Sequence, residues 1–198
     1  MNSRPLGLLD RQTVVPALIG DPSDFLIIAG LSGSAHDIGA LTNGMPNAYI
    51  LGGAMGAPIS MGLGLALAQP DLNILVVLGD GELLMSAGSL ATVAYMDPRN
   101  LSILCVDNGC YGETGNQVSA TVGPTDLELM ANGCGIPHSY TVHTETDIKH
   151  GHKVLRKSNS PSFVLVRVTN GPPPSYKRNF DGVEAKIAFR KYCQNNAP

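Results

Sequence analysis

Short apolar runs alternate with longer segments of helical spacing along this chain. The runs that fit buried strands are 25–29, 74–78, 101–106, 139–142 and 162–168. The segments with apolar residues at helical spacing are 11–19, 58–68, 82–95, 125–133, 147–157 and 183–192. This alternation predicts an α/β fold, a three-layer α/β/α sandwich around a mostly parallel central sheet.

The length and composition narrow the class of protein. A chain of 198 residues suffices for one α/β domain with a full core, so 1–198 is interpreted as a single domain, with a C-terminal tail helix at about 175–198. A formal net charge of -3 and the lack of a basic stripe argue against nucleic-acid binding. The four cysteines form no CxxC pair, which disfavours iron–sulfur and structural zinc sites and favours reduced thiols in the cytoplasm. The first residues lead into no uninterrupted apolar stretch, so we expect no signal peptide.

Residues 38–70 contain no Asp, Glu, Lys or Arg. A membrane span needs about 20 predominantly apolar residues, and here prolines, asparagines and glycines interrupt the stretch. We therefore expect no membrane role, and favour a helix buried against the sheet or against a partner chain.

Polar residues follow two of the predicted strands at their ends. Gly79-Asp80-Gly81 comes directly after 74–78, and Asp107-Asn108 comes directly after 101–106. Asp-Gly is also a common turn pair, so the triplet alone leaves a hairpin turn open. A fully apolar strand before it and a helix after it favour instead a site at the carboxyl ends of two parallel strands. One carboxylate and one amide oxygen there suit a magnesium ion that holds a diphosphate.

This arrangement, with 26 residues (82–107) between Gly81 and Asn108, resembles the diphosphate-binding motif of thiamine diphosphate enzymes. The resemblance implies the thiamine diphosphate-binding fold, with thiamine diphosphate and Mg²⁺ as cofactors. It implies that the metal ligands are Asp80, Asn108 and the backbone carbonyl of Cys110. The cofactor-binding residues that it implies are Ser32, Gly33, Ser34, Gly53, Ala54, Met55, Gly79, Asp80, Gly81, Glu82, Asn108, Cys110, Tyr111 and Gly112.

Two further segments support the resemblance, and each has an ordinary alternative. The run 52–56 resembles a glycine-rich stretch of the decarboxylase branch, in which a large apolar residue, here Met55, lies under the cofactor and bends it. The alternative is glycine-mediated helix packing. Ser32-Gly33-Ser34 stands where relatives carry hydroxyl groups that bind the diphosphate, and the alternative is a serine-rich turn.

From about 24 to 168 the chain is similar to the small β subunits of phosphonopyruvate and sulfopyruvate decarboxylases. The resemblance implies the diphosphate-binding subunit of a heteromeric 2-oxoacid decarboxylase. Thiamine catalysis also needs a glutamate on the cofactor's pyrimidine ring, and no glutamate of this chain matches that position. We therefore expect a pyrimidine-binding α subunit to supply it, in an α2β2 or larger heteromer that acts on a small 2-oxoacid.

Several positions depart from the family pattern. Glu82 replaces a common serine, and its carboxylate would repel a diphosphate unless the side chain turns away. Asp107 replaces an asparagine and adds negative charge near the metal. Ala35-His36-Asp37 stands in place of the Ser-Arg-Glu of phosphonopyruvate enzymes. His36 and Glu113 are the candidate catalytic residues, although a structural histidine and a solvated loop carboxylate are the plainer interpretations. Residues 109–124 form a polar loop long enough to be a lid.

Three other functions stay open from the sequence. A carboligase or transketolase-like half-enzyme would use the same cofactor. The β chain of a 2-oxoacid:ferredoxin oxidoreductase would as well, but should carry cluster cysteines. A non-catalytic binding subunit would keep the fold and lose the metal through Glu82 and Asp107.

Overall fold

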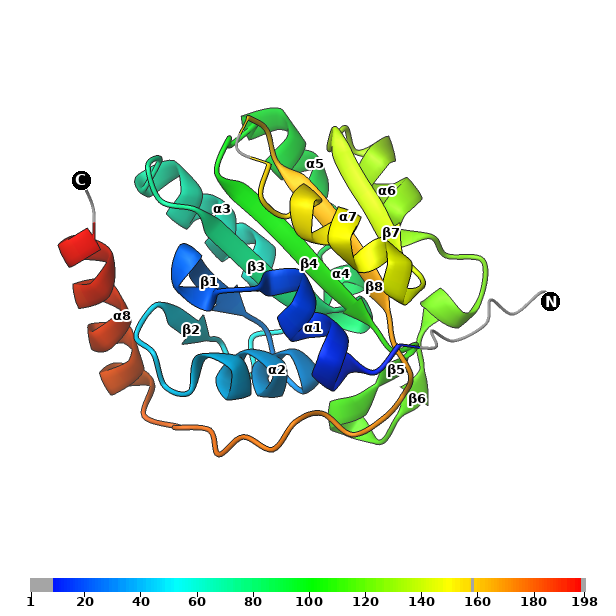
Figure 1. Cartoon of the computed structure of the whole chain (residues 1–198), viewed down its shortest axis with the longest axis horizontal. Helices are drawn as coiled ribbons and strands as arrows, with labels where there is room; N and C mark the ends of the chain where they lie inside the picture. The colour runs from blue at the N-terminus through cyan, green and yellow to red at the C-terminus, as the bar shows by residue number, and fades with distance from the viewer. Residues whose placement is uncertain (1–8, 158, 197–198) are drawn as a thin grey trace.

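The computed structural model describes residues 9–157 and 159–196, and its centre is a six-stranded sheet with helices on both faces (Figure 1). The strands, in spatial order, are β2 (Ala48–Ile50), β1 (Leu26–Ala29), β3 (Ile74–Gly79), β4 (Leu101–Asp107), β8 (Ser162–Arg167) and β7 (His138–Val142). Each neighbouring pair is parallel. The helices are α1 (Arg11–Ile19), α2 (Gly33–Thr42), α3 (Pro58–Ala68), α4 (Asp80–Met85), α5 (Ser89–Met96), α6 (Leu127–Gly133), α7 (Ile148–Val154) and α8 (Gly182–Asn196). The predicted α/β/α sandwich is confirmed.

The two faces of the sheet pack two separate cores. Along β3, the side chains of Ile74, Val76 and Leu78 enter one core, and those of Leu75 and Val77 enter the other. The first core also holds residues of α3, α4, α5, α6 and α8, and the second holds residues of α1, α2 and α7. Because side chains of a strand alternate between faces, a strand covered on both sides is apolar throughout.

The order in which strands are added to the sheet reverses between β1 and β3. From β1 it passes through α2 to β2 on one side, and from β3 it passes through α4 and α5 to β4 on the other. Open parallel sheets bind ligands in the crevice outside the strand ends at such a point. The ends of β1, β3 and β4 therefore frame the expected site.

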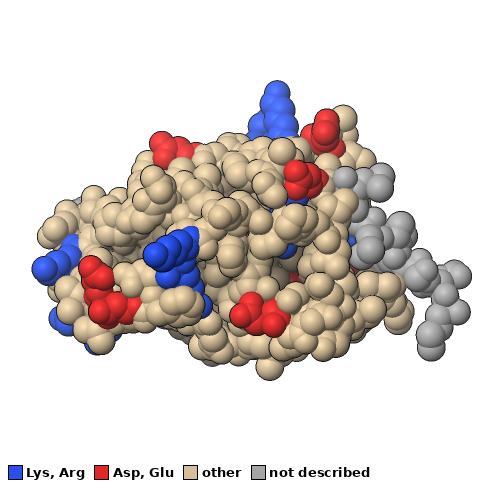
Figure 2. All heavy atoms as spheres, turned by 90° about the horizontal axis from the view of Figure 1, so that it is seen from below, with Lys and Arg blue, Asp and Glu red and all other residues tan. Residues whose placement is uncertain are grey.

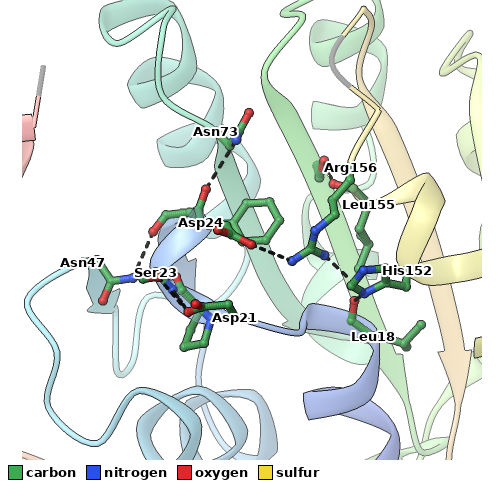
Figure 3. A network of polar contacts seen from close by, with 12 residues as sticks. Leu18, Asp21, Ser23, Asp24, Asn47, Asn73, His152, Leu155 and Arg156 are labelled. Atoms are coloured by element: carbon green, nitrogen blue, oxygen red, sulfur yellow. Dashed lines mark hydrogen bonds and ion pairs between the residues drawn. The ribbon is translucent and has the colours of Figure 1, made fainter. Parts of the chain in front are cut away.

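A polar network closes the opposite, amino-terminal edge of the sheet (Figure 3). Nη2 of Arg156 lies 3.1 Å from Oδ2 of Asp24, and its guanidinium lies 5.0 Å from the centre of the Phe25 ring. Asn47 donates to the carbonyl oxygen of Phe25 at 3.0 Å. These contacts fix the entry into β1, which positions its far end at the site.

Residues 170–181, here called the strap, connect β8 to α8 along the lower side of the molecule in Figure 1. The carbonyl oxygen of Pro174 lies 3.1 Å from Nδ1 of His36, and the Tyr176 ring lies where a side chain at Gly39 would stand. Arg178 donates from Nη1 to the carbonyl oxygen of Gly52 at 2.9 Å. The strap thus holds both α2 and the loop that carries Met55.

Three local expectations were wrong. No helix was predicted between 30 and 57, whereas α2 occupies Gly33–Thr42; its first residue Gly33 and its internal Gly39 weaken the helical pattern. No strand was predicted there either, whereas Ala48–Ile50 form β2, a three-residue edge strand that is only half-buried. The predicted helix 82–95 is two helices, α4 and α5, because the backbone leaves helical geometry at Ser86, with φ −137°.

The predicted loop 109–124 has structure of its own. It contains the antiparallel pair β5 (Cys110–Tyr111) and β6 (Gln117–Val118) and two short 3₁₀ turns. Its end is anchored, because Ser119 and Thr121 are buried. Whether its tip closes over a ligand stays a prediction. No helix of the described residues has the length and apolarity that crossing a membrane requires.

The contact between α3 and β3 gives a stability prediction. A Cβ atom at Gly62 would stand 2.2 Å from Cγ2 of Val76, whereas one at Gly64, two residues along the same helix, would meet nothing within 4 Å. We expect Gly62→Ala to lower the free energy of unfolding by about 1–3 kcal/mol, because it overpacks the core. Gly64→Ala should raise it by about 0.5–1 kcal/mol, the difference in helix propensity. Chemical denaturation of both variants checks this, and equal effects would contradict the packing.

Candidate functional site

Asp80 is the central polar residue at the carboxyl edge of the sheet. It opens α4 directly after β3 and is 1% exposed. Its Oδ2 accepts hydrogen bonds from Oγ of Ser119 and, at 3.1 Å, from Oγ1 of Thr121. Burial first, and then the neighbouring Asp107, raise the pKa of Asp80 to about 6. Ionising Asp80 in the folded protein therefore costs free energy unless a cation binds beside it.

Asp107 ends β4 beside Asp80 and has its own cation. Its Oδ1 accepts from Oγ1 of Thr121 at 2.8 Å and from the Gly109 amide at 2.9 Å. Its Oδ2 lies 3.6 Å from Nε of the buried Arg167, and neither of these two atoms has a hydrogen-bond partner. The expected excess of negative charge from Asp107 is thus offset by Arg167, which the sequence analysis did not identify.

Asn108 and Cys110 bring further oxygens to the same edge. Oδ1 of Asn108 accepts from the Cys110 amide at 3.3 Å, and Nδ2 donates to Oδ1 of Asn170 at 3.0 Å. Together with Asp80, these residues offer a carboxylate, an amide and a carbonyl oxygen, the hard ligands that Mg²⁺ prefers. The donor set fits that ion.

Glycines around these residues let neighbouring segments of the chain lie close together. A Cβ atom at Gly81 would stand 2.3 Å from the Tyr111 ring, and one at Gly112 would stand 3.2 Å from Oγ of Ser32. The loop after β4 therefore faces both the start of α4 and the start of α2. Exposed amides in such a cradle suit the oxygens of a phosphate group.

One cavity of about 620 Å³ joins these elements. Of the candidate catalytic, metal-binding and cofactor-binding residues, Gly53 and Ala54 do not line it, and the others do: Ser32, Gly33, Ser34, His36, Met55, Gly79, Asp80, Gly81, Glu82, Asn108, Cys110, Tyr111, Gly112 and Glu113. The sequence analysis did not single out Arg11, Leu31, Met85, Val106, Thr114, Asn116 and, on the strap, Asn170, Gly171, Pro172 and Pro173. The strap residues follow β8, so the strand-end rule that found Asn108 would also have found Asn170.

Residues 30–166 match the family described as thiamine pyrophosphate enzyme, C-terminal TPP binding domain. This chain is a member of that family. The family assignment made from the strand-end motif is confirmed.

Relatives with curated names are similar over part or most of the chain. The sulfopyruvate decarboxylase subunit beta of Methanocaldococcus jannaschii is 47% identical over 100 residues, which are 50% of this chain and 50% of that protein. The subunit of the same name from Methanococcus maripaludis is 33% identical over 158 residues, 80% of this chain and 83% of that protein. The sulfopyruvate decarboxylase of Methanosarcina acetivorans is 31% identical over 161 residues, but this chain spans only 41% of its length.

Solved structures show the same fold. A thiamine diphosphate-dependent 4-hydroxybenzoylformate decarboxylase from Rhodococcus jostii RHA1 matches with a TM-score of 0.68 and 22% identity, over 85% of this chain and 34% of that one. This likeness shows that the two chains share a fold over most of this chain.

Glu82, the unusual residue of this TPP-binding domain, turns toward the end of β1. Its carboxyl group lies against Gly30, where a Cβ atom would stand 1.8 Å from Oε2, and Oε2 accepts from the Leu31 amide at 3.4 Å. Burial raises the pKa of Glu82 to about 7, so near neutral pH the group is often protonated. This removes much of the expected repulsion.

The two candidate catalytic residues lie at the outer part of the cavity. His36 is half-buried and contacts the strap through Pro174 and, edge to face, Tyr176. Glu113 is exposed in the turn between β5 and β6. Both line the cavity.

The variant Asp80→Asn is expected to change the stability of the metal-free protein and the effect of Mg²⁺ in opposite directions. Folding raises the pKa of Asp80 from 3.8 to about 6, so the folded state favours the protonated carboxyl group. The stability that Asp80 contributes is therefore complete below pH 3.8 and is lost as the pH rises through 6. At pH 8 and without metal, we expect Asp80→Asn to be more stable than the parent chain by on the order of 2 kcal/mol, and the gap should close toward pH 4. Added Mg²⁺ should raise the melting temperature of the parent alone.

Thermal unfolding at pH 4, 6 and 8, with and without Mg²⁺, checks this prediction. Asp71→Asn, an exposed aspartate in a turn, is the control and should behave as the parent does. An Asp80→Asn variant that is still stabilised by Mg²⁺ would show that the ion binds elsewhere.

Proposed function

We propose that this chain is the diphosphate-binding β subunit of a heteromeric 2-oxoacid decarboxylase that depends on thiamine diphosphate and Mg²⁺. The observation that carries the proposal is the meeting of Asp80, Asn108 and the Cys110 carbonyl with the glycine-lined start of α2 in one cavity. The names of the relatives, sulfopyruvate decarboxylase subunit beta and phosphonopyruvate decarboxylase, supply the reaction class.

In this proposal each group of residues has a separate task. Asp80, Asn108 and the Cys110 carbonyl hold Mg²⁺, and the amides around Gly81 and Gly112 hold the diphosphate. Hydroxyl groups of Ser32 and Ser34 and the amide of Gly33 add to the same anion site, while Gly79 and Tyr111 shape it and the Glu82 amide donates to it. Met55 supports the cofactor at the rim, with Gly53 and Ala54 beside it. The bound cofactor supplies an electron sink for the departure of CO₂.

His36 and Glu113 are the proton carriers of this proposal. Nδ1 of His36 is engaged by the strap carbonyl of Pro174 at 3.1 Å, so Nε2 is the nitrogen left to exchange a proton with substrate. Glu113 is placed on the hairpin that borders the cavity, where it could reach a substrate only when a partner closes the site. Each role stays a prediction until variants are assayed.

A partner subunit completes the proposal. Met55 and Met85 line the cavity and are 36% and 60% exposed, so apolar side chains stand at its rim. Figure 2 shows the side of the molecule along which the strap runs, and uncharged residues cover most of it. Such a rim suits a pyrimidine-binding α subunit that brings the activating glutamate, in an α2β2 or larger assembly. Relatives that are called subunit beta support the existence of that partner.

The names of the relatives support a substrate class, and the cysteines support a compartment. We infer a small 2-oxoacid with a second acidic group, by analogy with sulfopyruvate and phosphonopyruvate. The four cysteines are free thiols, which supports a reducing compartment such as the cytoplasm. A carboligase would share every residue discussed so far, so the assay must follow the aldehyde as well as CO₂.

Purification from the native source tests the proposal. We expect a partner of similar size to co-purify, and the complex to release CO₂ from sulfopyruvate or phosphonopyruvate only with thiamine diphosphate and Mg²⁺. Asp80→Ala should reduce this rate at least about 100-fold, because the metal is lost. Recovery of this chain as a homo-oligomer without a partner, or full activity of Asp80→Ala, would refute the assignment.

A further inference from the structure

Arg11 reaches the cavity from a part of the chain that precedes the matched family region, which begins at residue 30. It is the first residue of α1, is 5% exposed and lines the cavity. A buried guanidinium beside a ligand cavity needs an explanation, because arginine is rarely buried without a charged partner.

Asp37 is that partner, and the geometry of the pair fixes the guanidinium. Nε of Arg11 donates to Oδ1 of Asp37 at 3.0 Å, and Nη2 donates to Oδ2 at 2.6 Å. Two parallel bonds of this kind use one edge of the planar group. The edge formed by Nη1 and the second N–H of Nη2 is the one that an incoming oxyanion can use.

That second edge lies at the start of α2. A Cβ atom at Gly33 would stand 2.3 Å from Nη2, 2.4 Å from Nη1 and 2.5 Å from the central carbon of Arg11. These nearly equal distances place the flat face of the guanidinium over Gly33. Since Gly33 and Asp37 are four residues apart, they share one face of α2. Arg11 therefore extends along that face from Asp37 to the first turn of the helix.

The first turn of α2 also directs backbone donors at the cavity. Its leading amides have no partner within the helix, and Ser32 provides no side-chain cap. Ser32, Gly33 and Ser34 line the same cavity as Arg11. A helix of 10 residues adds the positive end of its dipole at this point.

The charges of the cavity wall make Arg11 distinctive. Of the Lys and Arg residues that the structure describes, Arg11 alone lines this cavity, and the carboxyl groups of Asp80, Glu82 and Glu113 line it too. A diphosphate carries about three negative charges near neutral pH, of which one Mg²⁺ offsets two. Because Asp37 neutralises Arg11, the guanidinium contributes a local positive edge and hydrogen-bond donors rather than net charge, and these would serve the phosphate oxygens that the metal does not hold.

We propose that Arg11 binds a phosphate-type oxyanion at the start of α2, primarily the terminal phosphate of the cofactor, and that Asp37 is a positioning residue which holds the guanidinium in place. The inference rests on the proposed function, since it assumes that a diphosphate enters this cavity. An acidic group of the substrate has the same chemistry and is the other source of such an anion.

Two variants with opposite expected effects test the proposal. In Asp37→Asn the amide oxygen can still accept one hydrogen bond from the guanidinium, which keeps Arg11 in place, while the neutralising negative charge is gone. The affinity for inorganic diphosphate in the presence of Mg²⁺ should therefore stay equal or increase. In the double variant Arg11→Gln/Asp37→Asn the pair is replaced by neutral groups and no buried charge is stranded. Its affinity should fall about 10- to 100-fold, the range for losing hydrogen bonds to a charged group. Isothermal titration calorimetry of the full chain measures both.

The control is a more exposed arginine–aspartate pair at the amino-terminal edge of the sheet (Figure 3). The double variant Arg156→Gln/Asp24→Asn removes an ion pair whose two atoms, Nη2 and Oδ2, lie 3.1 Å apart, and it leaves the net charge unchanged, as the Arg11/Asp37 double variant does. It should leave diphosphate affinity unchanged, which excludes a general effect of removing an ion pair. Arg11→Lys keeps the charge but loses the two-pronged geometry, and an affinity between those of the parent and the double variant would support direct contact.

The outcomes separate the two proposals. If the parent chain binds Mg-diphosphate and a folded double variant binds it equally well, Arg11 only stabilises the fold and the inference is overturned. If the parent binds no Mg-diphosphate, the proposed function itself fails. In the complex with its partner, unchanged cofactor affinity together with weaker inhibition by methylphosphonate or sulfoacetate would assign Arg11 to the acidic group of the substrate.

Discussion

Burying a carboxyl group without a positive partner is unfavourable, and the carboxyl edge of this sheet buries several. Asp37 is paired with Arg11, and Asp107 is paired with Arg167. Asp80 differs, because its partners among the described residues are the hydroxyl groups of Ser119 and Thr121. Two of the three buried aspartates thus have a cation from the chain itself. The third lacks one, which is the physical basis for proposing that Asp80 binds a metal ion.

Those pairs also explain why remote segments converge on one site. Arg11 comes from α1, Arg167 from the end of β8, and Ser119 and Thr121 from the end of the segment that follows β4. None of these is adjacent in sequence to the carboxyl group that it contacts. The hairpin, the strap and α1 are held at the strand ends partly by this electrostatic requirement, and they then form the wall of the cavity.

The sequence was informative where a local rule applied. Strands β3 and β4 are apolar on both faces, so their limits and the placement of Asp80 and Asn108 at their ends could be predicted. Helix α1 could be predicted as well, since Asp10 caps it and its apolar residues recur at helical spacing. Asp126 likewise caps α6, accepting a hydrogen bond from the Leu129 amide.

Other features depended on contacts between distant residues. Tertiary contacts accompany α2, with Tyr176 packed on Gly39 and Arg11 on Gly33. The position of Glu82 depends on Gly30 leaving room for its carboxyl group. The sequence contained each of these residues, but no spacing rule pairs Arg11 with Asp37 or Arg167 with Asp107, so these two ion pairs could not be foreseen.

The glutamates of this chain lie in positions unsuited to the one that thiamine catalysis requires. Glu82 is committed to the end of β1, where the Leu31 amide donates to it and Gly30 makes room for it. Glu113 is exposed on the hairpin, and Glu128 accepts from Thr141 on β7, away from the cavity. Glu184 accepts from Asn179 at the start of α8. Glu145 is exposed in the short 3₁₀ turn before α7. A pyrimidine ring at the Met55 rim would find none of these five glutamates in place, which is the reason for proposing that a second subunit supplies the carboxylate.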